Sequence, residues 1–215
     1  MIKIKIFVFS YFAENTYLVF DEVTKEALVI DAGCFNDDEK KELEDYIVKN
    51  ELKLKYMVTT HCHIDHVIGN EFVKSRFNPV YYAPEEDQKL YNIVPEQARQ
   101  FGLGDVEKGP EPDSFITEDT VLSIGQINFR FLFTPGHSPG EYCVLFEKEK
   151  ICFSGDVLFK QSIGRTDLWD GDSDTLINSI KNKLFVLDDD TTVFPGHGEH
   201  TTIGYEKYGN PYVSN

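Results

Sequence analysis

The stretch Thr60-His61-Cys62-His63-Ile64-Asp65-His66, residues 60–66, decides the fold. The apolar segment KYMVTT leads into it as a predicted strand, and a helix is expected to follow it. Imidazole and carboxylate groups are ligands that suit Zn²⁺ and related ions. Because side chains alternate along an extended segment, both rings of the His-x-His pair can lie on one side. Asp65 and His66, at the turn into the helix, can then face a second metal position.

Four residues cannot satisfy two metal ions, so a two-metal site requires further ligands downstream. Three candidates each follow a predicted strand and lie beside a glycine, which lets the backbone turn sharply and present the side chain. They are His137 after INFRFLF, Asp156 after KICF and His197 after TTV. The sequence therefore predicts seven ligands, which are His61, His63, Asp65, His66, His137, Asp156 and His197.

The hydrophobic pattern predicts strands and helices in two β-rich halves. Predicted strands cover Ile2–Phe9, Thr16–Phe20, Ala27–Ile30, Leu54–Thr59, Pro79–Tyr82, Val121–Ile124, Ile127–Phe133, Tyr142–Phe146, Ile151–Phe153 and Thr192–Phe194. Predicted helices cover Asp38–Asn50, Asp65–Arg76, Pro84–Gln100 with a break or restart at Pro95, and Ser173–Leu184 with Ser173 as its cap. The segment Gly102–Ser114 is expected to be a loop. Two sheets covered by helices indicate an α/β, four-layer αββα sandwich, formed by a single domain over residues 1–215.

The chain is strongly acidic, with 37 acidic and 21 basic residues and a net charge of −16. Such a surface repels phosphate backbones and anionic lipids, so no nucleic acid and no membrane is expected as a partner. The alternation of Lys3 and Lys5 with isoleucines is typical of a half-buried strand, and no small-residue cleavage site follows it. A signal peptide is therefore not expected, and the expected partner is a small-molecule substrate.

The cysteines follow no regular framework, which indicates reduced thiols and a cytoplasmic protein. They are Cys34, Cys62, Cys143 and Cys152. Cys62 lies between two predicted ligands, but alternation points it away from their metal, so we expect a packed thiol. His200 is expected at the surface or behind a ligand. Trp169 fits equally the mouth of a substrate site and the packing of an irregular loop.

These motifs resemble the metallo-β-lactamase superfamily along nearly the whole chain. An aspartate at Asp156, where zinc β-lactamases have cysteine, is similar to hydrolases of the glyoxalase II type. The strings GDVLF (155–159), SIGRTD (162–167) and PGHG (195–198) resemble the short, single-domain bacterial members of that type. By this resemblance His61, His63 and His137 hold a first metal ion, Asp65, His66 and His197 hold a second, and Asp156 bridges them. The implied cofactors are two divalent metal ions, with zinc expected first and iron or manganese as alternatives.

Two further residues match positions of the family. Asp31 matches a carboxylate that orients ligand histidines, although a turn aspartate is an equal alternative. Arg165 matches a basic position that binds glutathione, but it can instead pair with Asp167 or Asp170 and shape its loop. The larger glyoxalase II has a tyrosine where this chain has Asp167, and it adds a helical C-terminal domain that binds glutathione.

The resemblance implies hydrolysis of a thioester, such as S-D-lactoylglutathione or a related acyl thiol, by a metal-bridging hydroxide. Asp65 and Asp156 are the predicted catalytic carboxylates. The nearest alternative is a mononuclear iron persulfide dioxygenase, which shares the Thr-His-Cys-His-x-Asp-His and Gly-Arg-Thr-Asp strings. An RNA-processing nuclease of the same fold is disfavoured by the acidic charge. A purely structural metal protein is disfavoured because structural zinc sites are typically closed and rich in cysteine.

Overall fold

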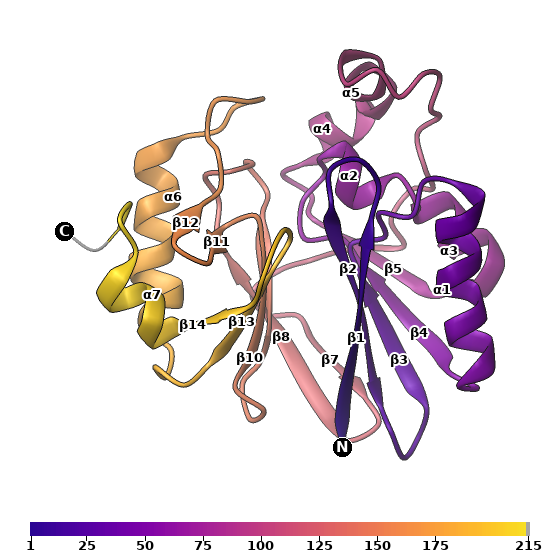
Figure 1. Cartoon of the computed structure of the whole chain (residues 1–215), viewed down its shortest axis with the longest axis horizontal. Helices are drawn as coiled ribbons and strands as arrows, with labels where there is room; N and C mark the ends of the chain where they lie inside the picture. The colour runs from indigo at the N-terminus through magenta and orange to yellow at the C-terminus, as the bar shows by residue number, and fades with distance from the viewer. Residues whose placement is uncertain (214–215) are drawn as a thin grey trace. The chain divides into compact units, whose positions relative to one another are not determined.

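A computed structural model describes residues Met1–Val213, and its chain divides into two units. The first unit comprises Met1–Phe115 and Ser123–Ile127, and the second comprises Ile116–Leu122 and the chain from Asn128 onward. Each unit carries one six-stranded sheet with helices (Figure 1). The single-domain organisation stays a prediction.

The first sheet has the strand order β1-β2-β3-β4-β5-β6. Its strands are β1 (Ile2–Phe9), β2 (Glu14–Asp21), β3 (Glu26–Ile30), β4 (Lys53–Val58), β5 (Val80–Ala83) and β6 (Ser114–Phe115). The first three strands pair antiparallel, whereas β3 to β6 pair parallel. Because the carboxyl ends of β3 and β4 meet at one edge, the residues that follow them, Asp31 and the 60–66 stretch, lie next to each other.

The helices of the first unit are α1 (Asp37–Lys49), α2 (Ile64–Val67), α3 (Asn70–Phe77), α4 (Gln88–Asn92) and α5 (Val94–Gln100). A capping box starts α1, since the Asn36 side chain accepts a hydrogen bond from the Glu39 N–H and the Glu39 side chain accepts from Asn36. The helix buries Leu43 and Ile47. In Figure 1, α1 and α3 lie along one side of the sheet, whereas α2, α4 and α5 gather at one end of it.

The structure corrects one predicted helix, and for another it decides between a break and a restart at Pro95. The single helix expected over Asp65–Arg76 is divided into α2 and α3. Gly69 lies between them, its N–H bonds the carbonyl of Ala32 at 2.7 Å, and a Cβ at this position would collide with that carbonyl. The loop after β3 therefore interrupts the helix. Pro95 restarts rather than ends the later helical segment, because it occupies the first turn of α5, where proline is tolerated.

The second sheet has the strand order β14-β13-β10-β9-β8-β7. Its strands are β7 (Val121–Ile124), β8 (Ile127–Phe133), β9 (Tyr142–Phe146), β10 (Ile151–Gly155), β13 (Thr192–Pro195) and β14 (Thr201–Thr202), and β11 (Leu158–Phe159) pairs separately with β12 (Ser162–Ile163). Strand β10 is parallel to β13 and antiparallel to β9, which is antiparallel to β8. The ends of β8, β10 and β13 therefore lie at one edge, and each precedes a predicted ligand.

The helices of the second unit are α6 (Ser173–Ser179), the π-helical turn η1 (Ile180–Leu184) and α7 (Ile203–Gly209). Leu176, Ile180 and Leu184 pack into a core with Leu145 and Val193 of the sheet. The predicted cap of α6 was wrong by one residue, because Asp172 accepts the hydrogen bond from the Thr175 N–H at 2.7 Å. The sequence also missed five short elements, which are β6, β11, β12, β14 and α7.

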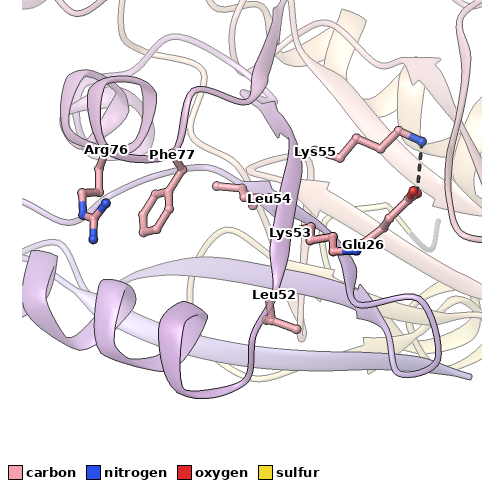
Figure 2. Close-up of a pocket in the computed structure, with 7 residues that line it drawn as sticks. All are labelled: Glu26, Leu52, Lys53, Leu54, Lys55, Arg76 and Phe77. Carbon is pink, nitrogen blue, oxygen red and sulfur yellow. Dashed lines mark hydrogen bonds and ion pairs between the residues drawn. The ribbon is translucent and has the colours of Figure 1, made fainter.

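The first unit has an open hollow of about 570 Å³ at the amino ends of β3 and β4 (Figure 2). Glu26, Lys53, Lys55, Arg76 and Phe77 line it together with Leu52 and Leu54. These strands carry Asp31 and the 60–66 stretch at their carboxyl ends, so the hollow is at the opposite edge of the sheet and is not part of the metal-ligand cluster.

None of the helices formed by residues Met1–Val213 has the length and apolar character needed to cross a membrane.

Candidate metal centre

The histidines of the 60–66 stretch gather at the carboxyl end of β4. His61, His63 and His66 are all buried. The ring centroid of His61 lies 4.8 Å from that of His63 and 4.1 Å from that of His66. Asp65 Oδ2 lies 3.7 Å from His66 Nε2. The strand, loop and short helix thus bring the four predicted ligands of the first unit together.

Asp31 fixes two of these histidine rings. It accepts hydrogen bonds from His66 Nδ1 at 3.0 Å, from the Thr60 N–H at 2.7 Å and from the Thr60 hydroxyl at 2.8 Å. Since the hydroxyl donates to Asp31, its oxygen accepts from His61 Nδ1, 3.0 Å away. With the proton on Nδ1 in both rings, Nε2 is the nitrogen suited to bind a metal ion.

The backbone of Asp31 supports this role. Its φ of 52° lies in the left-handed region, which is unfavourable for a residue with a side chain. Such strain persists where surrounding contacts over-determine the conformation, often at functional sites. Three hydrogen bonds to its carboxylate supply that restraint at the point where β3 ends.

Glu14 is a buried carboxyl group beside Asp31 and His66 that the sequence did not single out. One ligand atom from each of these three residues lies within 4.8 Å of the others. Glu14 Oε2 accepts from the Thr16 hydroxyl at 2.9 Å, which accepts from the Gly33 N–H at 2.9 Å. Burial raises the pKa of Glu14 well above its usual value. No signal in the sequence pointed to Glu14, because the predicted strand began at Thr16 and the burial of β2 along its whole length is known only from the structure.

In the second unit, His137, Asp156 and His197 follow β8, β10 and β13. Asp156 Oδ2 lies 3.5 Å from His137 Nε2 and also 3.5 Å from His197 Nε2. His137 and Asp156 are buried, while the His197 side chain is 27% exposed. A carboxylate oxygen equally close to two imidazole nitrogens suits a ligand shared by two metal ions, and the donor types fit zinc, iron or manganese.

The loop after β12 supports two of these ligands through its main chain. His137 Nδ1 donates to the carbonyl oxygen of Arg165 at 2.7 Å, which leaves Nε2 on the side of Asp156. The neighbouring Gly164 packs so closely that a Cβ there would collide with the Asp156 carbonyl. The backbone at residues 164–165 thus restrains both His137 and Asp156.

Glu141 is a second supporting residue that the sequence did not single out. It is completely buried, and its Oε1 accepts from the Asp156 N–H at 2.6 Å. The main-chain carbonyl of Glu141 accepts from the Thr134 N–H at 2.8 Å. Glu141 therefore connects the start of β9 to the turn that carries Asp156. Its position in the HSPGEY string (137–142) gave no such signal, because the bond partner lies 15 residues away.

The Arg165 guanidinium pairs with Asp167 rather than standing free. Nε donates to Asp167 Oδ1 at 2.7 Å and Nη2 donates to Oδ2 at 2.8 Å. This bidentate pair lowers the pKa of Asp167 to about 2. The geometry is that of the loop-shaping alternative, and substrate binding by Arg165 stays a prediction.

The sequence analysis also singled out Cys62, His200 and Trp169. Cys62 is a buried free thiol whose pKa burial raises, so the prediction of a packed thiol is confirmed. All four cysteines are buried, and none forms a disulfide. The His200 ring lies 5.7 Å from that of Phe194 and is exposed to solvent. Trp169 has a φ of 32° in the loop before α6.

A family model described as the metallo-beta-lactamase superfamily matches residues 11–197. The chain is similar to hydroxyacylglutathione hydrolase GloC of Haemophilus influenzae, with 38% identity over 213 residues, which cover 99% of this chain and 98% of that protein.

Two crystal structures share the fold over almost the whole chain. The BLEG-1 B3 metallo-beta-lactamase is 32% identical, with a TM-score of 0.90 over 99% of this chain and 100% of that chain. TTHA1623 in a di-iron-bound form is 32% identical, with a TM-score of 0.85 over 97% and 100% of the respective chains. These likenesses confirm the predicted fold class, an α/β sandwich with two sheets.

Proposed function

Because the chain belongs to the metallo-β-lactamase superfamily of hydrolases, we propose that it cleaves acyl thioesters with two bound metal ions. His61, His63 and His137 hold the first ion in this proposal, and Asp65, His66 and His197 hold the second. Asp156 bridges them. The similarity to a hydroxyacylglutathione hydrolase over 99% of the chain supports a thioester such as S-D-lactoylglutathione as the substrate.

One observation carries the two-metal assignment. Asp156 Oδ2 lies at the same distance, 3.5 Å, from Nε2 of both His137 and His197. An oxygen equally close to two imidazole nitrogens fits a ligand shared by two ions. Two-metal sites have ion separations of about 3.5–4 Å, which one carboxylate can span.

The chemistry follows from the donor set. If the proposed residues hold two divalent ions, these would supply a water-derived nucleophile near neutral pH and would polarise the thioester carbonyl. Asp31 and the Arg165 carbonyl hold three of the ligand rings in the orientation that presents Nε2. A thiol has a pKa of about 8.5, so it leaves as thiolate with little help from a general acid. The proposed reaction therefore needs no separate general acid.

Zinc is the proposed metal, and the di-iron form of TTHA1623 makes iron the first alternative. Iron is also the metal of the competing proposal, a mononuclear iron persulfide dioxygenase. The two functions differ in metal stoichiometry and in their need for oxygen, so they can be separated directly.

The test combines metal analysis of the purified protein with two assays. We expect close to two metal ions per chain, hydrolysis of S-D-lactoylglutathione and no oxygen uptake with glutathione persulfide. A single iron with oxygen uptake would establish the dioxygenase instead. The metal-loaded protein could also be inactive on glutathione thioesters but active on thioesters of other thiols. That result would support thioester hydrolysis and show that the thiol carrier is not glutathione.

A further inference from the structure

The side chain of Gln97, on α5, bonds the ligand loop on both sides of His63. Gln97 Oε1 accepts from the Ile64 N–H at 2.9 Å, and Gln97 Nε2 donates to the Cys62 carbonyl at 3.1 Å. The same nitrogen donates to the Leu90 carbonyl at 2.9 Å, which connects α4 to the arrangement. Gln97 is completely buried, so water does not compete for these bonds.

These two bonds restrain the backbone of His63 itself. The Cys62 carbonyl and the Ile64 N–H belong to the two peptide groups that flank the Cα of His63. Holding both groups with one planar amide restrains the two dihedral angles between them, which are φ −72° and ψ 150°. Those angles set the direction in which the imidazole leaves the main chain.

Asp87 extends the restraint by one peptide group. This buried residue precedes α4, and its Oδ2 accepts from the Cys62 N–H at 2.9 Å. That N–H belongs to the peptide group joining His61 to Cys62. Three consecutive peptide groups of the ligand loop are therefore bonded to side chains from residues 87–97.

We propose that Gln97 is a positioning residue of the metal centre, which sets the orientation of His63 by bonding both peptide groups beside it. The inference rests on the proposed function to the extent that His63 is taken as a ligand. A side-chain amide is suited to this role because it offers an acceptor and a donor side by side. Neither an ionised carboxylate nor an apolar side chain of the same length offers both.

The test compares Gln97→Met with Gln100→Met, an exposed position on the same helix. Methionine keeps the length of glutamine and removes both bonds. Zinc affinity is measured on the metal-free proteins by competition with a chelator. We expect Gln97→Met to bind zinc about 10–100-fold more weakly, the range found when groups that orient ligands are removed. Gln100→Met should match the wild type.

A cobalt-substituted sample provides a second readout, because its visible spectrum reports the ligand geometry. We expect an altered spectrum in Gln97→Met and an unaltered one in Gln100→Met. Wild-type affinity and spectrum in Gln97→Met would overturn the positioning role. If Gln97→Met does not fold, Gln97→Glu takes its place, since it keeps the bond to Ile64 and turns an oxygen toward the Cys62 carbonyl.

The outcomes separate this inference from the proposed function. Wild-type protein that binds zinc but hydrolyses no thioester would refute the thioester assignment, while weaker zinc binding by Gln97→Met would still support the positioning role. Active wild-type protein with unchanged zinc affinity and cobalt spectrum in the folded Gln97 variant would refute the positioning role alone.

Discussion

The Nδ1 atom of His137 lies 2.7 Å from the main-chain carbonyl oxygen of Arg165. Arg165 thus contacts a predicted metal ligand through its backbone, while its guanidinium bonds Asp167. The two parts of one residue can be tested apart, because a substitution changes the side chain and keeps the carbonyl.

Arg165→Met is expected to leave the metal content unchanged and to raise KM for a glutathione thioester. The increase should be about tenfold, the effect of losing one charge-assisted contact to a substrate carboxylate. Small neutral thioesters lack that carboxylate and should keep their KM. Steady-state kinetics on both substrates, with Asp167→Asn in parallel, make the measurement. An equal loss of activity on both substrates would favour the loop-shaping role. Unchanged kinetics on both would show that Arg165 has no role in the site.

Asp156→Ala should reduce activity far more than Cys62→Ala. The first change removes the proposed shared ligand, so kcat/KM should fall by more than about 100-fold, beyond the range for residues that only support a ligand. The second removes a packed thiol and should keep activity within about threefold of the wild type. Metal analysis and thioester kinetics on both variants check this. Retention of two metal ions by Asp156→Ala would contradict the bridging role.

Gly164→Ala is expected to weaken metal binding although residue 164 is not a ligand. The added Cβ meets the carbonyl oxygen of Asp156, and this collision must displace one of the two backbone segments. We expect a loss of about 1–3 kcal/mol in unfolding free energy, typical of overpacking. Gly209→Ala is the matched control, because a Cβ there meets only Gln161 Nε2 at 3.6 Å. Similar metal affinities in the two variants would show that the 164–165 backbone does not position Asp156.

Glu26→Gln tests a pH-dependent contribution to stability at the hollow in Figure 2. The Gly125 N–H at 2.9 Å and Lys55 Nζ at 3.1 Å both bond Glu26 Oε2, and they lower the pKa of this carboxyl. A lowered folded-state pKa gives stability that is present above the unfolded pKa, about 4.5, and is lost as pH falls through the folded value. We expect the unfolding free energy of Glu26→Gln to be about 0.5–1 kcal/mol lower than that of the wild type at pH 7. The difference is small because the Glu26 and Lys55 side chains are both about one-third exposed and water screens their interaction.

Urea unfolding of wild type and Glu26→Gln from pH 7 down to pH 3 measures that deficit, which should shrink as the carboxyl is protonated. Glu86→Gln, at an exposed position, should show no such trend. A pH-independent deficit in Glu26→Gln would mean that the carboxylate charge is not its source.

The sequence identified the predicted ligands because each has a local signature. His137, Asp156 and His197 follow apolar strands beside a glycine, and the other four lie within six residues. The supporting residues have no such signature. Gln97 occupies an ordinary helical position 35 residues from Cys62, and its role depends entirely on which backbone atoms the fold brings to it. The roles of Glu14 and Glu141 likewise depend on contacts distant in sequence, so they were recognised only from burial and distances in the structure.

The boundaries of the elements were predictable where local chemistry decides them. Acidic residues and the buried pair Leu43 and Ile47 located α1 to within one residue. The division between α2 and α3 was not predictable, because Gly69 is restrained by the carbonyl of Ala32, which lies in another part of the sequence. Local patterns thus determined the presence of the elements, whereas a contact distant in sequence determined where α2 ends and α3 begins.

The spacing of the ligands has a consequence for the order in which the protein matures. The predicted ligands His61, His63, Asp65 and His66 lie so close along the chain that an unfolded polypeptide already presents them together. Those after β8, β10 and β13 approach one another only when the strands have paired. A nascent chain can therefore capture an ion before it folds, and binding to the unfolded state reduces the stabilisation that the same ion gives to the native protein.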